Sequence, residues 1–281
     1  MAIGKWGSRG RAGLACALAA WGVSGGIPAR ADVIGDFAAS EEIAHETQAG
    51  KRAAERGDYA VALQHYRRAL AEHGRLPGAP PLDAARYRNQ IGIVYLRMGR
   101  NREALEMLTR AAESAEETEG SNSPVSAAIY GNLGIASDKL GEYEQALRWY
   151  GKALPVREKE NSAETAETYH GIAREHAALG HHREAVQWYE KALSIQAKVL
   201  GDDHLAIAST RHAAAVAYAH LGDYRKALEY LHAAAATFGK AGHGSPSGLA
   251  STYRNIAWVY FKQKDYAKAE EWKQKAAAVG G

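Results

Sequence analysis

The feature that most constrains the fold of this chain is one segment that recurs at nearly fixed spacing. The recurring stretches are RGDYAVALQHYRRAL, LGEYEQALRWYGKAL, LGHHREAVQWYEKAL, LGDYRKALEYLHAAA and QKDYAKAEEWKQKAA. Their turns, with one more in register, align at Gly57, Gly99, Gly141, Gly180, Gly222 and Lys264, at intervals of 42, 42, 39, 42 and 42 residues. A period of this length indicates stacked supersecondary units, each of which buries its apolar face only against its neighbours.

Each unit carries a helical pattern of small and large residues after its turn. A small residue stands five positions after the turn, at Ala62, Ala104, Ala146, Ala185, Ala227 and Ala269. A large one follows four positions later in most units, at Tyr66, Leu108, Tyr150, Tyr189 and Leu231, and alanine returns three positions beyond it. Steps of four and three place these residues on one face of a helix, where small residues let a neighbouring helix approach.

A second helix is predicted before each turn. Ile91, Leu133, Ile172 and Ile256 are each followed by glycine or alanine, which lets the two helices of a pair pack closely. Pro81, Pro124 and Pro246 stand where these first helices begin, a position at which a missing N–H costs little. Pro155 lies late in the second helix of the third unit, and we expect it to end that helix early and to account for the interval of 39.

With six hairpins in register, the chain resembles the tetratricopeptide repeat family over roughly residues 41–279. The period of 42 and the linker VLGDDHLAIAST (199–210) are similar to the kinesin light chain subtype. The resemblance implies an all-α fold, a right-handed superhelix of about six helix pairs with a concave groove lined by first helices. It implies no fixed activity, because function lies in the groove residues. Lys273 replaces the large residue of the last unit and is predicted to cap the end.

The N-terminus has the form of a secretory signal peptide. Lys5, Arg9 and Arg11 precede the apolar run AGLACALAAWGV, and an Ala-x-Ala pattern ends at Ala31. This predicts cleavage after residue 31, a short linker over 32–40, and a periplasmic or secreted protein. The apolar run is too short to span a bilayer, and the small-residue pattern disfavours a retained anchor.

Removal of the leader changes the charge of the chain. Of 35 basic and 32 acidic side chains, four basic and no acidic ones lie in residues 1–31, which leaves a net charge of −1 for the rest. Nucleic-acid binding therefore loses its electrostatic support. The single cysteine, Cys16, leaves with the leader, so the remaining fold has no disulfide.

No catalytic, cofactor or metal motif stands out in the sequence. The chain has no glycine-rich phosphate loop, no H-E-x-x-H and no G-x-S-x-G. His181 and His182 form the one adjacent histidine pair, but His182 occupies a turn position that is Tyr59, Tyr143, Tyr224 and Tyr266 elsewhere. A packed turn residue is favoured over a zinc ligand, since zinc requires three or four converging ligands. We expect no enzymatic activity and no cofactor.

Candidate binding residues come from the first-helix positions that should line the groove. They combine amides, which pair with a peptide backbone of any sequence, with cationic and aromatic side chains. The predicted groove residues are Asn89, Gln90, Asn132, His170, Arg174, His212, Arg254, Asn255 and Trp258. With further cations at Arg86, Arg97, Lys139 and Lys262, this wall is either a basic surface for an acidic partner or a set of solvated helix faces.

These observations predict an exported scaffold or adaptor that binds a protein or peptide in its groove. Two alternatives remain open, a scaffold that uses its convex face or ends, and a non-catalytic accessory subunit of an envelope enzyme or transport complex. A hydrolase of envelope polymers would require a convergent acid pair or nucleophile, which the sequence does not suggest.

Overall fold

The described residues of the chain form twelve α-helices and no strand. A computed structural model describes residues 28–201, 203–240 and 245–280. The first helices of the six pairs are α2 (Pro28–Glu55), α4 (Pro81–Arg97), α6 (Pro124–Lys139), α8 (Ala163–Ala178), α10 (Leu205–His220) and α12 (Pro246–Lys262). The second helices are α3 (Tyr59–His73), α5 (Asn101–Glu119), α7 (Tyr143–Glu160), α9 (His182–Val199), α11 (Tyr224–Phe238) and α13 (Tyr266–Gly280).

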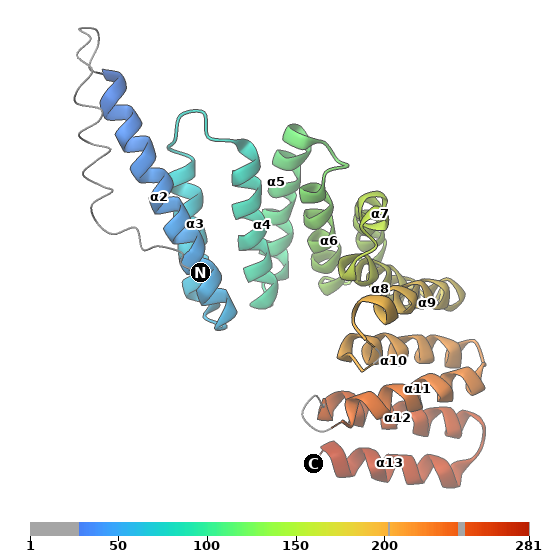
Figure 1. The fold of residues 1–281 in the computed structure, drawn as a ribbon. Helices are drawn as coiled ribbons and strands as arrows, with labels where there is room; N and C mark the ends of the chain where they lie inside the picture. Colours follow the sequence, from blue (N-terminus) through green and yellow to red (C-terminus); the bar gives the residue numbers. More distant parts are fainter. Residues whose placement is uncertain (1–27, 202, 241–244, 281) are drawn as a thin grey trace, which may run out of the picture.

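The helices stack in chain order as a solenoid (Figure 1). Each second helix packs on its own first helix and on the first helix of the next unit. Successive first helices also touch from α4 to α12, which places them on the inner side of the curve. The all-α superhelix of helix pairs that the repeat predicts is therefore confirmed. We number the pairs as units one to six.

The core follows the pattern of small and large residues in the sequence. The alanines five and twelve positions after each turn are buried, and Tyr66, Leu108, Tyr150, Tyr189 and Leu231 fill the space between them. In the last unit Lys273 is exposed and pairs with Glu270 at 3.4 Å. Charged residues thus cover this part of α13, where no further unit packs in the described chain.

The turn inside each pair requires a left-handed backbone. Gly57, Gly99, Gly141, Gly180 and Gly222 have φ between 73° and 82°, a region that glycine enters without steric cost. Lys264 holds the same position in unit six with φ 64° and carries the strain of a side chain there.

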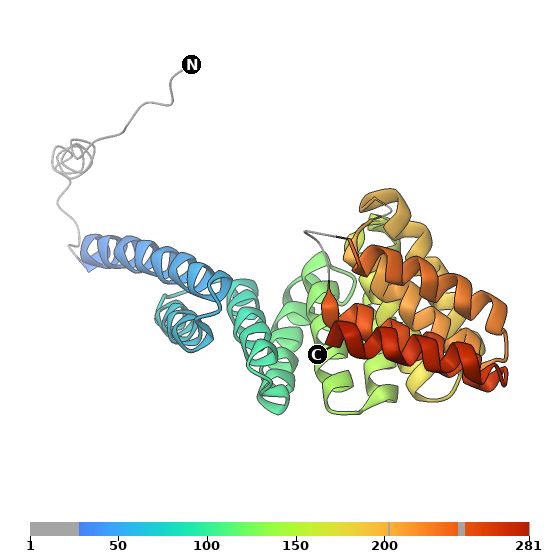
Figure 2. The same ribbon diagram turned by 90° about the horizontal axis from the view of Figure 1, so that it is seen from below.

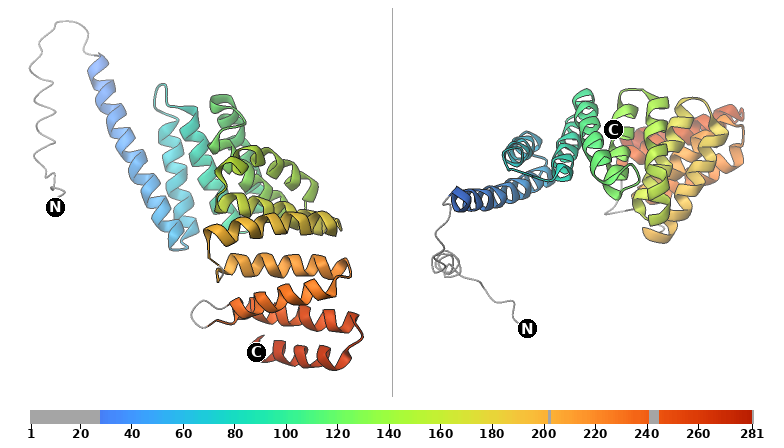
Figure 3. Two further views of the ribbon diagram at one scale, coloured as in Figure 1. Left: turned by 45° about the vertical axis from the view of Figure 1, so that its right-hand side comes forward. Right: turned by 90° about the horizontal axis from the view of Figure 1, so that it is seen from above.

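The solenoid changes direction between α6 and α8. Helices α2–α6 stand side by side at one end, and α8–α13 form a second stack that crosses them (Figures 1 and 3). Viewed from below, α13 lies in front of the other helices of the second stack, and α2 lies on the far left of the described chain (Figure 2). Only residues 161 and 162 connect α7 to α8, whereas residues 120–123 connect α5 to α6.

The expectation that Pro155 ends its helix early is wrong. Helix α7 continues through Pro155 to Glu160. Pro155 and Gly151 are both exposed, so the carbonyl that loses its helical hydrogen bond can be hydrated. The interval of 39 coincides instead with the two-residue connector, in which Asn161 adopts φ 48°.

The predicted signal peptide lies almost entirely outside the described residues. Helix α2 begins at Pro28, so cleavage after Ala31 would remove the first four residues of this helix. Within the part of the chain that the structure describes, none of the helices is both long and apolar enough to cross a bilayer.

Candidate functional site

The inner side of the solenoid contains a groove across its first three first helices. Its volume is about 460 Å³, and it lies between α2, α4 and α6. Of the predicted residues, Asn89 and Gln90 line it, together with Thr47, Arg86 and Tyr87. The remaining lining residues are Pro124, Val125 and Ala128, which are all apolar. A largely apolar lining with a few polar groups is typical of ligand-binding sites.

Two predicted amides from successive units contact one another. Nδ2 of Asn132 donates to Oδ1 of Asn89 at 2.9 Å. The pair links α4 to α6 and still leaves the Asn89 amino group and the Asn132 carbonyl for a ligand. Asn132 also borders a smaller hollow of about 90 Å³ at the change of direction, with Tyr150, Glu164 and Glu167.

His212 and Asn255 are joined in a similar way in the second half of the solenoid. The hydroxyl of Thr252 donates to Gly248 O at 2.8 Å and therefore accepts from His212 Nδ1 at 2.9 Å. Nε2 of His212 is then an acceptor, and Asn255 Nδ2 donates to it at 2.9 Å. This network fixes a neutral tautomer of His212, and burial lowers the pKa of His212 as well.

His170 is held by the unit that follows it. Its Nδ1 lies 3.0 Å from Oγ1 of Thr210, which donates to Ala206 O, so His170 Nδ1 is the donor of this pair. Burial, and next the charge of Arg174, lower the pKa of His170 to about 4. His170 is therefore neutral at pH 7 and adds an acceptor to the inner face, not a positive charge.

Arg174 is engaged in ion pairs inside the protein. Its Nη2 lies 2.9 Å from Asp138 and 3.3 Å from Glu175. Glu175 is 0% exposed, and its Oε2 has no hydrogen-bond partner among the described residues. Burial, and next the charge of Asp138, raise the pKa of Glu175 to about 7. Arg174 thus already pairs with Asp138 and Glu175 at the change of direction, while 41% of its side chain stays exposed.

Sequence reasoning missed Asp138 and Glu175. The position of Glu175, five before the turn, holds Val94, Ala136, Ala217 and Val259 in units two, three, five and six, and the exposed Arg52 in unit one. A carboxylate at a position that is apolar and buried in four of the six units is the signal that could have revealed this cluster.

The last unit combines exposed cations with aromatic rings. Arg254 is exposed, and Lys262 Nζ lies 5.4 Å from the ring centre of the half-buried Trp258. The rings of Trp258 and His220 also pack together, with their centres 5.4 Å apart, and Phe261 is 52% exposed. Arg254 and Trp258 therefore remain accessible as predicted groove residues, and Arg254, unlike Arg174, forms no ion pair with another described residue.

The histidines of the turns pack against one another. His182 stacks on His220 with ring centres 4.4 Å apart, and His176 lies 5.8 Å from His181. Across the described ranges, no three His, Cys, Asp or Glu side chains converge in a way that could hold a metal ion.

Comparison with known proteins establishes the family. The sequence profile of the tetratricopeptide repeat matches residues 45–117, 83–159, 125–198, 164–240 and 207–279. The chain belongs to the tetratricopeptide repeat family. A solenoid of these repeats is consistent with a protein-binding scaffold. No curated protein is significantly similar to this chain in sequence.

Solved structures share the fold at low sequence identity. BtubC (BKLC) from P. vanneervenii is 20% identical with a TM-score of 0.62, over 86% of this chain and 91% of that one. A putative kinesin light chain of Podosopora anserina with nearly identical repeats is 21% identical, with a TM-score of 0.59, over 72% and 97%. PilF of Pseudomonas aeruginosa is 16% identical, with a TM-score of 0.62, over 86% and 94%. The kinesin light chain-like resemblance is thereby confirmed for the fold.

Proposed function

We propose that this protein is an exported, non-catalytic scaffold or adaptor that binds a protein or peptide in the groove of its solenoid. The observation that carries the proposal is the groove of about 460 Å³ beside Asn89 and Gln90. Its amides retain free donors and acceptors after the contact between Asn89 and Asn132. A polypeptide backbone offers the complementary groups along its length.

An acidic partner fits the charges of the inner face. Arg97, Lys139, Arg254 and Lys262 form no ion pair with any other described residue. Carboxylates of a partner could therefore pair with them without breaking an internal ion pair. Trp258 and Phe261, beside Arg254, supply an aromatic anchor of the kind that dominates binding energy in protein interfaces.

Export rests on the sequence of residues 1–31. A periplasmic or secreted location predicts that the protein recovered outside the cytoplasm starts at Asp32. Mass spectrometry of the protein from the envelope fraction tests this, and a chain that retains residues 1–31 would contradict it.

A capture experiment tests the groove. The full-length protein with a C-terminal tag is cross-linked in its native cells, beside an Asn132→Ala, Arg254→Glu variant and an Arg102→Glu, Arg225→Glu variant. The first alters the inner face, and the second changes exposed charges on second helices. A partner lost only from the first variant supports the groove, while a partner retained by it moves binding to another surface. Arg174 is left unchanged because its substitution would unpair Asp138 and Glu175.

A further inference from the structure

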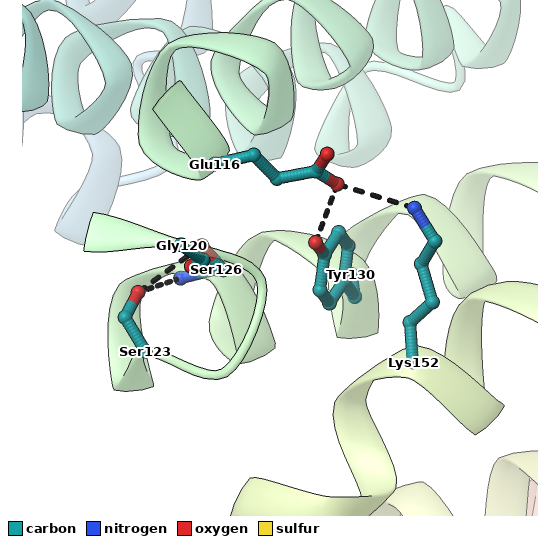
Figure 4. Close-up of polar contacts among 6 residues, drawn as sticks. All are labelled: Glu116, Gly120, Ser123, Ser126, Tyr130 and Lys152. Atoms are coloured by element: carbon teal, nitrogen blue, oxygen red, sulfur yellow. Dashed lines mark hydrogen bonds and ion pairs between the residues drawn. The ribbon is translucent and has the colours of Figure 1, made fainter. Parts of the chain in front are cut away.

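The outer side of the solenoid has a four-residue cluster that occurs at two successive junctions between units. At the junction of units two and three, Glu116 accepts hydrogen bonds from the Tyr130 hydroxyl and, at 3.2 Å, from Lys152 Nζ (Figure 4). Tyr130 stacks on Trp149 with ring centres 5.9 Å apart, and Lys152 Nζ lies 5.0 Å from both rings. A carboxylate, two aromatic rings and a cation together fill the space between the second helices.

The next junction repeats this cluster in the same register. Tyr169 donates to Glu158 at 2.9 Å and packs on Trp188 at 5.4 Å. Lys191 Nζ lies 3.9 Å from the centre of the Trp188 ring. Glu158, Tyr169, Trp188 and Lys191 align with Glu116, Tyr130, Trp149 and Lys152 when counted from the turns of their units.

At the junction of units four and five all four positions change. The residues there are Ala197, Arg211, Tyr230 and Ala233. The carboxylate and the cation are both replaced by alanine, and tryptophan is replaced by tyrosine. A groove of about 510 Å³ opens at this place, lined by the four residues with Leu193 and Ile207. It lies between the second helices α9 and α11, on the side opposite the row of first helices.

Arg211 gives this groove its chemical character. It is half-buried, and no carboxylate of the described chain lies within 4.0 Å of it. Of the two carboxylates at the rim, Glu190 accepts from the Tyr218 hydroxyl and lies 4.0 Å from Lys226. Glu229 is exposed at the other edge. The groove therefore has a cation at the position of Tyr130 and Tyr169, a tyrosine at the position of the tryptophans, and open space where the preceding junctions hold glutamate and lysine side chains.

We propose that this outer groove binds a segment of a partner protein in which a carboxylate lies beside an aromatic side chain. The carboxylate would pair with Arg211 in the space left by Ala197, and the ring would pack on Tyr230 above Ala233. A polypeptide can present both groups to the groove at once, much as separate helices supply the side chains that fill the equivalent space at the two preceding junctions. This inference rests on the proposed scaffold function but uses a second face of the solenoid.

The test uses two fluorescein-labelled, alanine-based helical peptides. One carries Glu and Trp four residues apart, so that both lie on one helix face, and the other carries Gln in place of Glu. Fluorescence anisotropy with the full chain is expected to give saturable binding, about tenfold tighter for the Glu peptide than for the Gln peptide. Arg211→Leu should abolish this preference, whereas Arg254→Glu, on the inner face, should keep it.

A variant that fills the groove provides the second measurement. Ala197→Glu, Arg211→Tyr, Tyr230→Trp and Ala233→Lys together restore the cluster of the preceding junctions, so this variant should melt at or above the wild-type temperature and bind neither peptide. Lack of saturable binding to the wild type, equal affinity for the two peptides, or binding by the filled variant would each overturn the proposal. Loss of binding by Arg254→Glu with retention by Arg211→Leu would also overturn it while leaving the inner groove as the binding surface.

Discussion

Replacement of Gly134 by alanine tests how tightly the solenoid is packed where it changes direction. The Tyr150 ring lies between Gly134 of α6 and Gly171 of α8 and is only 3% exposed. A Cβ at Gly134 would lie 2.5 Å from Cε1 of Tyr150, and a Cβ at Gly171 would lie 2.7 Å from Cζ of the same ring. The ring therefore has a helix backbone on both faces and cannot move away from an added methyl group.

Two opposing effects set the size of the change. Alanine in place of glycine inside a helix stabilises by about 1 kcal/mol. Overpacking of a buried site costs up to about 3 kcal/mol, and the upper value applies because the ring is confined on both sides. Gly134→Ala should therefore destabilise the protein by about 2 kcal/mol. Gly131 lies one turn earlier on α6, and a Cβ added there would meet no atom within 4 Å, so Gly131→Ala should stabilise by about 1 kcal/mol.

The assay is thermal unfolding of the two variants and the wild type, followed by circular dichroism at fixed pH and salt. A difference of about 3 kcal/mol between the variants corresponds to a separation of about 6–12 °C in Tm for a chain of this size. Melting of Gly134→Ala within about 2 °C of Gly131→Ala would refute the confinement of Tyr150 between two helices. The same reasoning would then fail for Gly92, whose Cβ would lie 2.5 Å from Cγ of Leu108.

Three further predictions follow from single residues. Burial raises the pKa of Glu175 from 4.5 to about 7, so the native state retains a proton that the unfolded state loses, and stability falls as the pH rises through this window. The free energy of unfolding of Glu175→Gln, relative to that of the wild type, should thus rise by on the order of 3 kcal/mol between pH 4.5 and 7. Urea unfolding measures this, and a difference between the two proteins that does not change with pH would contradict it. Lys264→Gly should raise the stability by about 1 kcal/mol, because φ 64° is strained for lysine; an unchanged Tm would show that no strain is stored. Asn132→Ala should cost about 1 kcal/mol through its bond to Asn89, and Asn132→Gln, which keeps the amide, should lose less in the same assay.

The sequence was sufficient to predict the fold because each level of the pattern agrees with the others. Glycine at the turns provides the left-handed backbone, and alanines at Ala146 and Ala153 flank Tyr150 at one helical spacing. Because the same positions are apolar in all six units, only a regular stack of helix pairs buries them all. Pro155 was misjudged because a proline rule based on helix interiors takes no account of a carbonyl that water can reach.

The candidate site was less predictable because its contacts join residues about 40 positions apart. Asn89 meets Asn132, and His212 meets Asn255, only because the superhelix brings the same register of successive units together. Periodicity places each residue on the inner face, but it does not say whether neighbours bind one another or a partner. Arg174 shows the consequence. The sequence predicts it as a cation for an acidic ligand, but in the structure it already pairs with Asp138 and Glu175.

Departures from the repeat are where this chain differs from a generic solenoid. A buried charge at a position that is apolar in most units, such as Glu175, cannot contribute to stacking in the usual way. The same holds for the outer junction, where Arg211 and two alanines replace a cluster that stabilises the two preceding junctions. Loss of that cluster removes packing and hydrogen bonds from the folded protein, so the open groove costs stability. A binding role for Arg211 explains why this junction alone among three adjacent ones is left unfilled, and the filled variant measures both the stability gained and the binding lost.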